Sequence, residues 1–513
     1  MANPRFSAAG RWVLAASILG SSMAFIDGSV VSVALPVLQE EFGAPASSAQ
    51  WIVEAYQLFV ASLVLVGGSL ADRYGRKKIF VIGTSAFAGA SLACGLAPNT
   101  LALIAARSVQ GIAAALLIPS SLALLGGAFT PGQRGRAVGT WAALTGIAAA
   151  IGPALGGWLV QAVSWRAVFL VNLPIAAAVL AIALRKVPES RSPSGGPLDL
   201  AGAALATFGF GAIVYGLIEA PALGWANPLA WGTIAAGLAS VAALTLVELR
   251  VGHPMVPLGL FRNRTFAAAN LLTFFLYAAL AAIFFFIPFV LIQARRYTPA
   301  QAGAAILPLV FIVAALSRPA GAVADRVGPR LPLTVGPLVA GAGFLLLGLL
   351  PASGSYVATM LPALSVLGLG MAITVAPLTA TVLNGVPGKD QGTASGISNA
   401  VARVAGLLAI AIFGILAVSS FERTLDPLLD AARISHDTRA QLAPERAKLG
   451  AMKPPEGLPP AEANAVRTAV RKSLDGAFRV VSLGCAVLAL LSAACAAIGV
   501  AGPARSRRRG PAS

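Results

Sequence analysis

The stretch GGSLADRYGRKKIF, residues 67–80, decides the fold, because it sets a short polar loop between two long apolar runs. An apolar run of about 20 residues is long enough to cross the hydrocarbon core of a bilayer as a helix. The loop itself holds one acid, Asp72, and four basic residues. Basic residues collect in the cytoplasmic loops of membrane proteins, so we expect two spanning helices joined on the cytoplasmic side.

Apolar runs alternate with short polar gaps along the whole chain. Of its 513 residues, 57% are hydrophobic and only 11% are charged, whereas a soluble protein carries about 25% charged residues. We therefore predict an all-α membrane protein. Its fourteen predicted spans are residues 12–36, 50–70, 79–96, 100–123, 136–160, 165–185, 199–219, 228–248, 265–293, 300–322, 331–351, 357–384, 395–417 and 478–502.

The placement of Lys and Arg predicts the orientation. If the N-terminus is cytoplasmic, the short outer loops hold only Arg295 and Arg296, and both termini lie in the cytoplasm. The net charge of +18 is spread over many short gaps, so we expect no nucleic-acid partner. The two histidines both lie in predicted loops, so we expect no metal site.

The polar loop is repeated. GSLADRYGRK from Gly68 matches GAVADRVGPR from Gly321, and PGQRGRAVG from Pro131 matches PGKDQGTASG from Pro387. Parallel repeats of helices are an architecture of secondary transporters. The predicted domains are a six-helix half at 1–190, inserted helices 7 and 8 at 191–260, and a second six-helix half at 261–513 that includes an outer segment, 418–477.

Four further motifs carry a family resemblance. They are DGSVVSVALP (27–36), in which Ser29 replaces the usual Thr, RSVQGIAAA (107–115), GIAAAIGPALGG (146–157) and WRAVFLVNLP (165–174). With the polar loop, they make the chain resemble the major facilitator superfamily, in its fourteen-helix drug:proton antiporter branch of multidrug-resistance exporter type. The resemblance covers essentially the whole chain.

The resemblance implies that the repeated loop is part of a gate. In this reading Gly68 allows close helix approach, and Asp72 faces a helix N-terminus near residues 392–396. The alternative is a basic cluster that fixes topology alone. The predicted gate residues are Gly68, Asp72, Arg73, Gly75, Arg76, Asp325 and Arg326.

Three ionisable residues inside the spans are proton-coupling candidates. Helical rise places Asp27, Glu54 and Arg107 about 13, 6 and 10 Å below the outer ends of their spans. A charge inside a membrane is expensive, so we expect an acid–Arg–acid cluster that faces a wet cavity. The resemblance also links Arg107 to proton coupling. The alternative is a structural ion pair.

The motif in span 5 indicates the direction of transport, since the family's antiporters carry it and its symporters do not. Its small residues also allow tight helix contact, which is the alternative reading. The residues of this antiporter motif are Gly146, Gly152, Pro153, Gly156 and Gly157.

Residues for substrate contact are harder to predict. The aromatic-rich run 271–289 could line an apolar cavity, or it could pack and face lipid. Arg403 could contact substrate, or instead cover Asp72 or a helix end. The predicted cavity residues are Tyr56, Gln57, Gln110, Tyr277, Asn399 and Arg403.

These observations predict a proton-driven exporter of small amphipathic compounds that works by alternating access in the cytoplasmic membrane. No G-x-x-x-x-G-K-[ST] motif for ATP is present, so we expect the proton gradient as the energy source and no cofactor. A membrane enzyme would need a metal or nucleophile site in the spans, where histidine is absent, so we expect a transporter and not an enzyme. We expect a monomer in the lipid bilayer. The alternatives are a dedicated exporter of one host metabolite and, less favoured, a proton symporter for uptake.

Overall fold

The computed structural model describes residues 6–191, 199–224, 226–251, 254, 256–349, 354–387 and 391–501. These residues form helices and no strand. The ends of the chain, and with them the predicted cytoplasmic termini, lie outside the described residues. Residues 388–390 of the second repeat match and His253 lie outside them too.

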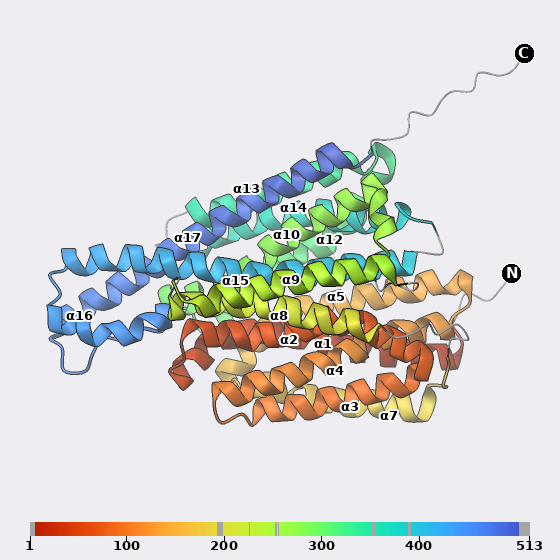
Figure 1. The fold of residues 1–513 in the computed structure, drawn as a ribbon, viewed down its shortest axis with the longest axis horizontal. Coiled ribbons are helices and arrows are strands. Elements are labelled where there is room, and N and C mark those ends of the chain that lie inside the picture. The colour runs from red at the N-terminus through yellow and green to blue at the C-terminus, as the bar shows by residue number, and fades with distance from the viewer. Residues whose placement is uncertain are drawn as a thin grey trace, which may run out of the picture. The chain divides into compact units, whose positions relative to one another are not determined.

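Fourteen helices among the described residues are long and apolar enough to cross a membrane, which confirms the predicted number. Two spans are each two helices in series, and one ends in a π-helical turn. Figure 1 labels most of them. They are α1 (Ala8–Phe42), α2 (Ala46–Tyr74), α3 (Arg76–Gly95), α4 (Thr100–Ala128), α5 (Pro131–Ala162), α6 (Ala167–Leu170) with α7 (Asn172–Lys186), α8 (Leu200–Leu223), α9 (Pro228–Arg250), α10 (Arg264–Phe289) with η2 (Val290–Ala294), α11 (Pro299–Ala304) with α12 (Leu307–Val327), α13 (Arg330–Leu349), α14 (Tyr356–Asn384), α15 (Gln391–Ala431) and α17 (Pro460–Gly499).

The chain divides into two compact units. The first unit comprises Met1–Pro257, Ala281–Leu307 and Gly406–Val481, and the second comprises Leu258–Leu280, Pro308–Ala405 and Ser482–Ser513. The first unit therefore contains the predicted first half and the inserted pair, together with parts of helices from the predicted second half. The domain boundaries at 190 and 260 stay a sequence-based prediction.

Small residues set the helix contacts of the first unit. A Cβ added at Gly67 of α2 would overlap the carbonyl group of Ala115 in α4, and one at Gly111 of α4 would lie 2.5 Å from the carbonyl oxygen of Tyr56. Without a hydrophobic drive between helices in lipid, such close backbone approach is a main source of packing energy. Gly67, and not the predicted Gly68, is thus the glycine that α4 approaches, since a Cβ at Gly68 would have an ordinary contact of 3.6 Å.

The inserted helices α8 and α9 form a pair that contacts α2. Trp51 of α2 donates a hydrogen bond of 2.9 Å to Glu219 of α8. Leu58 of α2 lies in one buried cluster with Val214 and Ile218 of α8. Beyond these contacts α9 exposes large apolar side chains, such as Leu238, as expected of a lipid-facing helix.

The second unit follows the same packing rule. A Cβ at Gly370 of α14 would collide with the backbone nitrogen of Ala340 in α13, and one at Gly343 of α13 would lie 2.6 Å from the backbone nitrogen of Leu367. Ser492 of α17 donates a hydrogen bond of 3.2 Å to the carbonyl oxygen of Leu272 in α10. Helix pairs α13–α14 and α10–α17 therefore form its frame.

In the outer segment, 418–477, two helices extend beyond the predicted spans. Helix α15 runs on to Ala431 and α17 begins already at Pro460, with α16 (His436–Leu442) and the 3₁₀ helix η4 (Ala443–Ala451) between them. Figure 1 shows α16 at the left, beside the end of α15 and the start of α17. Buried apolar side chains at one-turn spacing explain the extensions, and they include Phe421, Leu425 and Leu429 of α15 and Val466, Val470 and Leu474 of α17.

Candidate functional site

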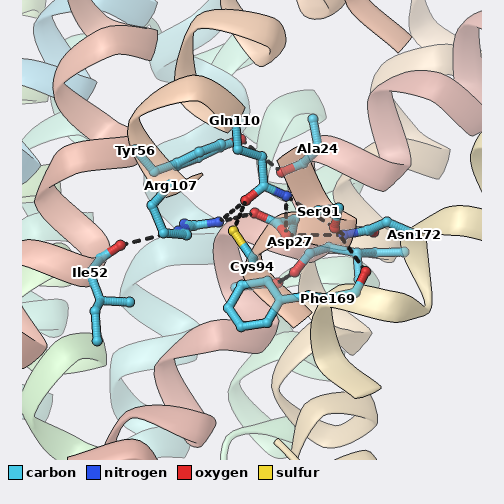
Figure 2. Close-up of polar contacts among 12 residues, drawn as sticks. Ala24, Asp27, Ile52, Tyr56, Ser91, Cys94, Arg107, Gln110, Phe169 and Asn172 are labelled. Carbon is cyan, nitrogen blue, oxygen red and sulfur yellow. Dashed lines mark hydrogen bonds and ion pairs between the residues drawn. The ribbon is translucent and has the colours of Figure 1, made fainter. Parts of the chain in front are cut away.

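Two oppositely charged side chains meet inside the first unit. Arg107 of α4 places Nη1 2.5 Å from Oδ2 of Asp27 in α1, and the two side chains are 1% and 0% exposed. Figure 2 shows the pair at the centre of a cluster of polar side chains. The sequence predicted only that these two residues lie at a similar depth in the membrane. The structure places their side chains in direct contact.

Neutral polar side chains complete the coordination of Asp27. Its Oδ1 accepts hydrogen bonds of 2.9 Å from Gln110 and 3.0 Å from Asn172. Ser91 of α3 in turn accepts bonds of 3.3 Å from Gln110 and 2.9 Å from Asn172. Cys94 donates to Oε1 of Gln110 at 3.6 Å. Both carboxylate oxygens are thus satisfied by neighbours on α4 and α7 (Figure 2).

Arg107 is held on its other sides as well. Its Nε donates to the carbonyl oxygen of Ile52 at 3.1 Å, and Nη1 also donates to Gln110 at 2.7 Å. The guanidinium carbon lies 4.3 Å from the centroid of the Tyr56 ring, a cation–π contact. The pair is buried and does not face a wet cavity as predicted, because protein groups take the places that water would fill.

Glu54 stands apart from this network. It lies on α2 and is fully buried, and neither carboxylate oxygen has a hydrogen-bond partner among the described residues. One turn earlier, Gln50 donates at 3.4 Å to the carbonyl oxygen of Ile410 in α15. Residues i and i+4 share a helix face, so Glu54 lies on the face of α2 toward α15. The expected acid–Arg–acid cluster is therefore wrong for Glu54 in this arrangement.

The polar loop between α2 and α3 is held by acids, one of which sequence reasoning missed. Asp72 pairs with Arg76 at 2.8 Å. Glu189, which follows α7, accepts hydrogen bonds from the backbone nitrogens of Lys77 at 3.0 Å and Lys78 at 3.1 Å. A carboxylate at a helix N-terminus is favourable, so Glu189 caps α3. The predicted contact between Asp72 and residues 392–396 stays a prediction.

The repeated loops share a backbone feature. Gly75 has φ +118° and Gly328 has φ +84°, values that suit glycine because it has no Cβ. Arg73, Asp325 and Arg326 are exposed, as loop residues outside a bilayer would be. The glycine of the motif is therefore needed at the same place in both loops.

The sequence profile of the Major Facilitator Superfamily matches residues 17–410, most of the chain. The chain belongs to the major facilitator superfamily. Multidrug resistance protein Stp of Mycobacterium tuberculosis (strain CDC 1551 / Oshkosh) is 36% identical over 423 residues, which are 82% of this chain and 78% of that protein. The tetracenomycin C resistance and export protein of Streptomyces glaucescens is 31% identical over 486 residues, or 94% of this chain and 90% of that protein.

A solved superfamily structure supports the fold. The inward-facing, unoccupied structure of a bacterial homolog to the human lysosomal transporter Spinster aligns with a TM-score of 0.63 at 18% identity, covering 98% of this chain and 100% of that one. With fourteen candidate spans among its described residues, the chain is a multi-pass membrane transporter of the major facilitator superfamily. The two relatives are themselves named for drug resistance, and one of them also for export.

The antiporter motif of this superfamily member packs α5 on two sides. A Cβ at Gly156 would lie 2.6 Å from the carbonyl oxygen of Val30 in α1. A Cβ at Gly157 would overlap the carbonyl group of Pro299 at the start of α11. A Cβ at Gly146 would meet no described atom within 4 Å. The helix contacts described here therefore do not explain why a glycine stands at this position.

Two further members of the motif tighten the same contacts. A Cβ at Gly152 would overlap the hydroxyl group of Ser29 in α1. The carbonyl group of Pro153 lies where a Cβ at Gly303 of α11 would fall. The helix α5 therefore joins α1 of the predicted first half to α11 of the predicted second half.

The predicted cavity residues are divided between the two units, so a cavity that they share stays a prediction. Tyr56 and Gln110 belong to the network of Arg107. Gln57 and Tyr277 are half-buried, and Asn399 is exposed with its amide bonded to the carbonyl oxygen of Ser395 at 2.9 Å. Arg403 is half-buried in the second unit. Sequence reasoning missed Ser91 and Asn172, although Asn172 is a polar residue in the quoted span 6 motif.

Proposed function

We propose that the protein exports small amphipathic compounds across the cytoplasmic membrane, driven by inward proton flow, by alternating access of its two halves. Export is supported by relatives named as resistance and export proteins. Proton coupling is supported above all by two buried features, the Asp27–Arg107 pair and the carboxylate of Glu54, which has no hydrogen-bond partner among the described residues. Intramembrane carboxylates of this kind are typical of proton relays.

The two acids are proposed to do different work. Asp27 is bonded by Arg107, Gln110 and Asn172, and these bonds tie α1 to α4 and α7. Glu54 has no such partner, and an isolated carboxylate in an apolar interior is unfavourable by several kcal/mol or more. We therefore assign proton loading to Glu54 in this arrangement, with its release on hydration.

Proton binding and transport are then coupled because the conformational equilibrium differs between protonated and ionised Glu54. A ligand shifts a conformational equilibrium only by its difference in affinity for the two states. A protonated Glu54 tolerates contact with α15, whereas an ionised one needs water. Proton binding would thus favour the state in which this face of α2 is covered, and substrate would favour the opposite transition. The proton gradient is the proposed energy source, with no cofactor.

Reconstituted proteoliposomes test the proposal. The measurement is uptake or release of ethidium under an imposed pH gradient, repeated after a protonophore collapses it. We expect gradient-driven transport for the wild type and for Glu422→Gln, whose carboxylate is exposed on α15. Glu54→Gln should lose driven transport and Asp27→Asn should weaken it. Driven transport that is the same in all four proteins would contradict the coupling assignment.

A second candidate, export of one host metabolite, is favoured by a particular relative. The Streptomyces glaucescens protein is named for resistance to and export of tetracenomycin C, and it matches 94% of this chain. A panel of neutral, anionic and cationic amphipaths separates the two functions, since a dedicated exporter responds to one structural class. Net accumulation, not depletion, inside cells would instead indicate the third possibility, proton-driven uptake.

A further inference from the structure

An apolar pocket lies inside the first unit, near the end of the bundle that is predicted to face outward. Its wall combines α1 and α2 of the predicted first half with the end of α10, the middle parts of α15 and α17, and η2 and η4. Four aromatic rings dominate it, those of Phe285, Phe286, Phe289 and Phe478. The pocket is separate from the Asp27 network, since none of its lining residues belongs to that network.

The polar groups in this wall are amides. Gln39, Gln50 and Gln293 line the pocket, and no charged side chain is among its described lining residues. Gln293 donates to Gln39 at 3.1 Å, and Gln39 donates to the carbonyl oxygen of Lys448 at 3.0 Å. Oε1 of Gln293 is buried and accepts no hydrogen bond among the described residues. An acceptor therefore remains available in an otherwise apolar and neutral site.

One of the lining residues from the outer segment, Leu449, has an unusual backbone conformation. Leu449 of η4 lines the pocket, with φ +50° and ψ −119°. These angles match the first central position of a type II′ turn, which glycine dominates, and a bulky residue there is an outlier. The next residue, Gly450, lies so close to Gln293 that a Cβ would overlap its amide oxygen. The turn thus holds the apolar side chain of Leu449 in the pocket wall, although its backbone angles are ones that leucine rarely adopts.

Salt bridges hold this turn in place from the outer side. Arg446 binds Asp426 of α15 through two bonds of 2.6 and 3.2 Å. Lys448 lies 2.5 Å from Glu445. Because the pocket joins helices of both predicted halves, any opening of this end must separate its walls and withdraw Leu449.

We propose that this pocket becomes an outer subsite for an uncharged aromatic group of the exported molecule when Leu449 withdraws from its wall. The space that it encloses with Leu449 in place, about 30 Å³, is too small for an aromatic ring. Ring stacking on four phenylalanines recognises the aromatic group, and Oε1 of Gln293 accepts a hydrogen bond from a hydroxyl or N–H group on it. The absence of charge in the described lining selects against cations. This inference rests on the proposed export function.

The test measures binding of N-phenyl-1-naphthylamine, an uncharged aromatic probe, to the full-length protein in lipid nanodiscs without a proton gradient. Empty nanodiscs give the background. Leu449→Gly removes the competing side chain and suits the turn, so we expect the Kd to fall by about tenfold. Leu449→Trp fills the pocket and should raise the Kd by about tenfold. Ala447→Trp adds the same group on the exposed side of the same turn and should leave the Kd unchanged.

Two further measurements keep the result decisive. Phe289→Leu preserves an apolar wall but removes a ring, and it should weaken probe binding severalfold, while ethidium binding stays constant in every variant. Equal probe affinity in wild type, Leu449→Gly and Leu449→Trp would overturn the subsite, as would equal effects of Leu449→Trp and Ala447→Trp. Failure of gradient-driven transport would instead overturn the proposed function, because probe binding needs no gradient.

Discussion

Asp27 and Arg107 are 80 residues apart in the sequence, yet they form an ion pair of 2.5 Å in which both side chains are almost fully buried. Burying two charges requires that every remaining donor and acceptor find a partner. Gln110, Asn172 and the carbonyl oxygen of Ile52 supply these partners. Because Gln110 and Asn172 also donate to Ser91 of α3, the network ties five helices, α1, α2, α3, α4 and α7, at one depth of the first unit.

Loss of Arg107 should be more damaging than its removal together with Asp27. Arg107→Ala leaves a buried carboxylate without its counter-ion, which destabilises a protein by about 3–5 kcal/mol. The double variant Arg107→Leu/Asp27→Leu removes both charges and should unfold at a higher temperature than the single variant. Thermal unfolding in detergent, followed by tryptophan fluorescence, measures the difference. A double variant less stable than Arg107→Ala would contradict this account of the pair.

Arg107→Lys tests the geometry of the same site. A lysine keeps the charge but has a single compact ammonium group, which does not reproduce the planar guanidinium contacts. The bonds of Arg107 to Asp27, Gln110 and Ile52 leave from two different nitrogen atoms. We expect the lysine variant to fold, to show a lower melting temperature and to lose most transport. Wild-type transport by Arg107→Lys would show that charge alone suffices.

Asn172 should be nearly as important as the charged pair. Its amide donates to both Asp27 and Ser91, so Asn172→Leu removes two donors from a buried carboxylate network. An unsatisfied buried polar group destabilises by about 1–3 kcal/mol. Melting temperatures of Asn172→Leu and of Gln441→Leu, an exposed amide on α16, provide the comparison. Equal melting temperatures would mean that Asn172 does not support the network.

The sequence predicts some of these features well and others poorly, for physical reasons. Ionisable residues are rare in spans, so Asp27, Glu54 and Arg107 stand out from their apolar surroundings. Ser91 is one of several polar neutral residues, and which of them reaches Asp27 depends on how each helix is rotated. Helix rotation also explains why Glu54 is not part of the network. Its predicted depth lies in the same half of the membrane as the pair, but it lies on the face of α2 toward α15.

The outer segment shows a different limit. Hydropathy does not show that α15 and α17 continue beyond the predicted spans, because it detects long apolar runs and not polar helices that bury one apolar stripe. The one-turn spacing of Phe421, Leu425 and Leu429 was the available signal. The position of Leu449 in a strained turn has no sequence signal, since the turn type depends on contacts with Gln293 and Leu474.

The two glycines at the start of the polar loop motif should respond differently to the same change. Gly67→Ala places a methyl group against the backbone of Ala115 and Leu116, and backbone atoms cannot move aside without shifting α2 from α4. Overpacking of this kind destabilises by about 1–3 kcal/mol. Gly68→Ala adds a methyl group at ordinary contact distance from Pro119 and should be tolerated. The reverse order of melting temperatures would contradict the observed helix contact.

The antiporter motif offers a second matched pair, in which transport and stability can be separated. Gly156→Ala pushes against the carbonyl oxygen and Cα of Val30, so we expect a lower melting temperature and a loss of gradient-driven transport. Gly146→Ala has open space around its new methyl group, and alanine is the better helix former by about 1 kcal/mol, so its melting temperature should hold or rise. If Gly146→Ala nevertheless abolishes transport, the residue must be approached by another helix in a different conformation of the cycle. If it transports like the wild type, the need for small residues in this motif is confined to the helix contacts with α1 and α11.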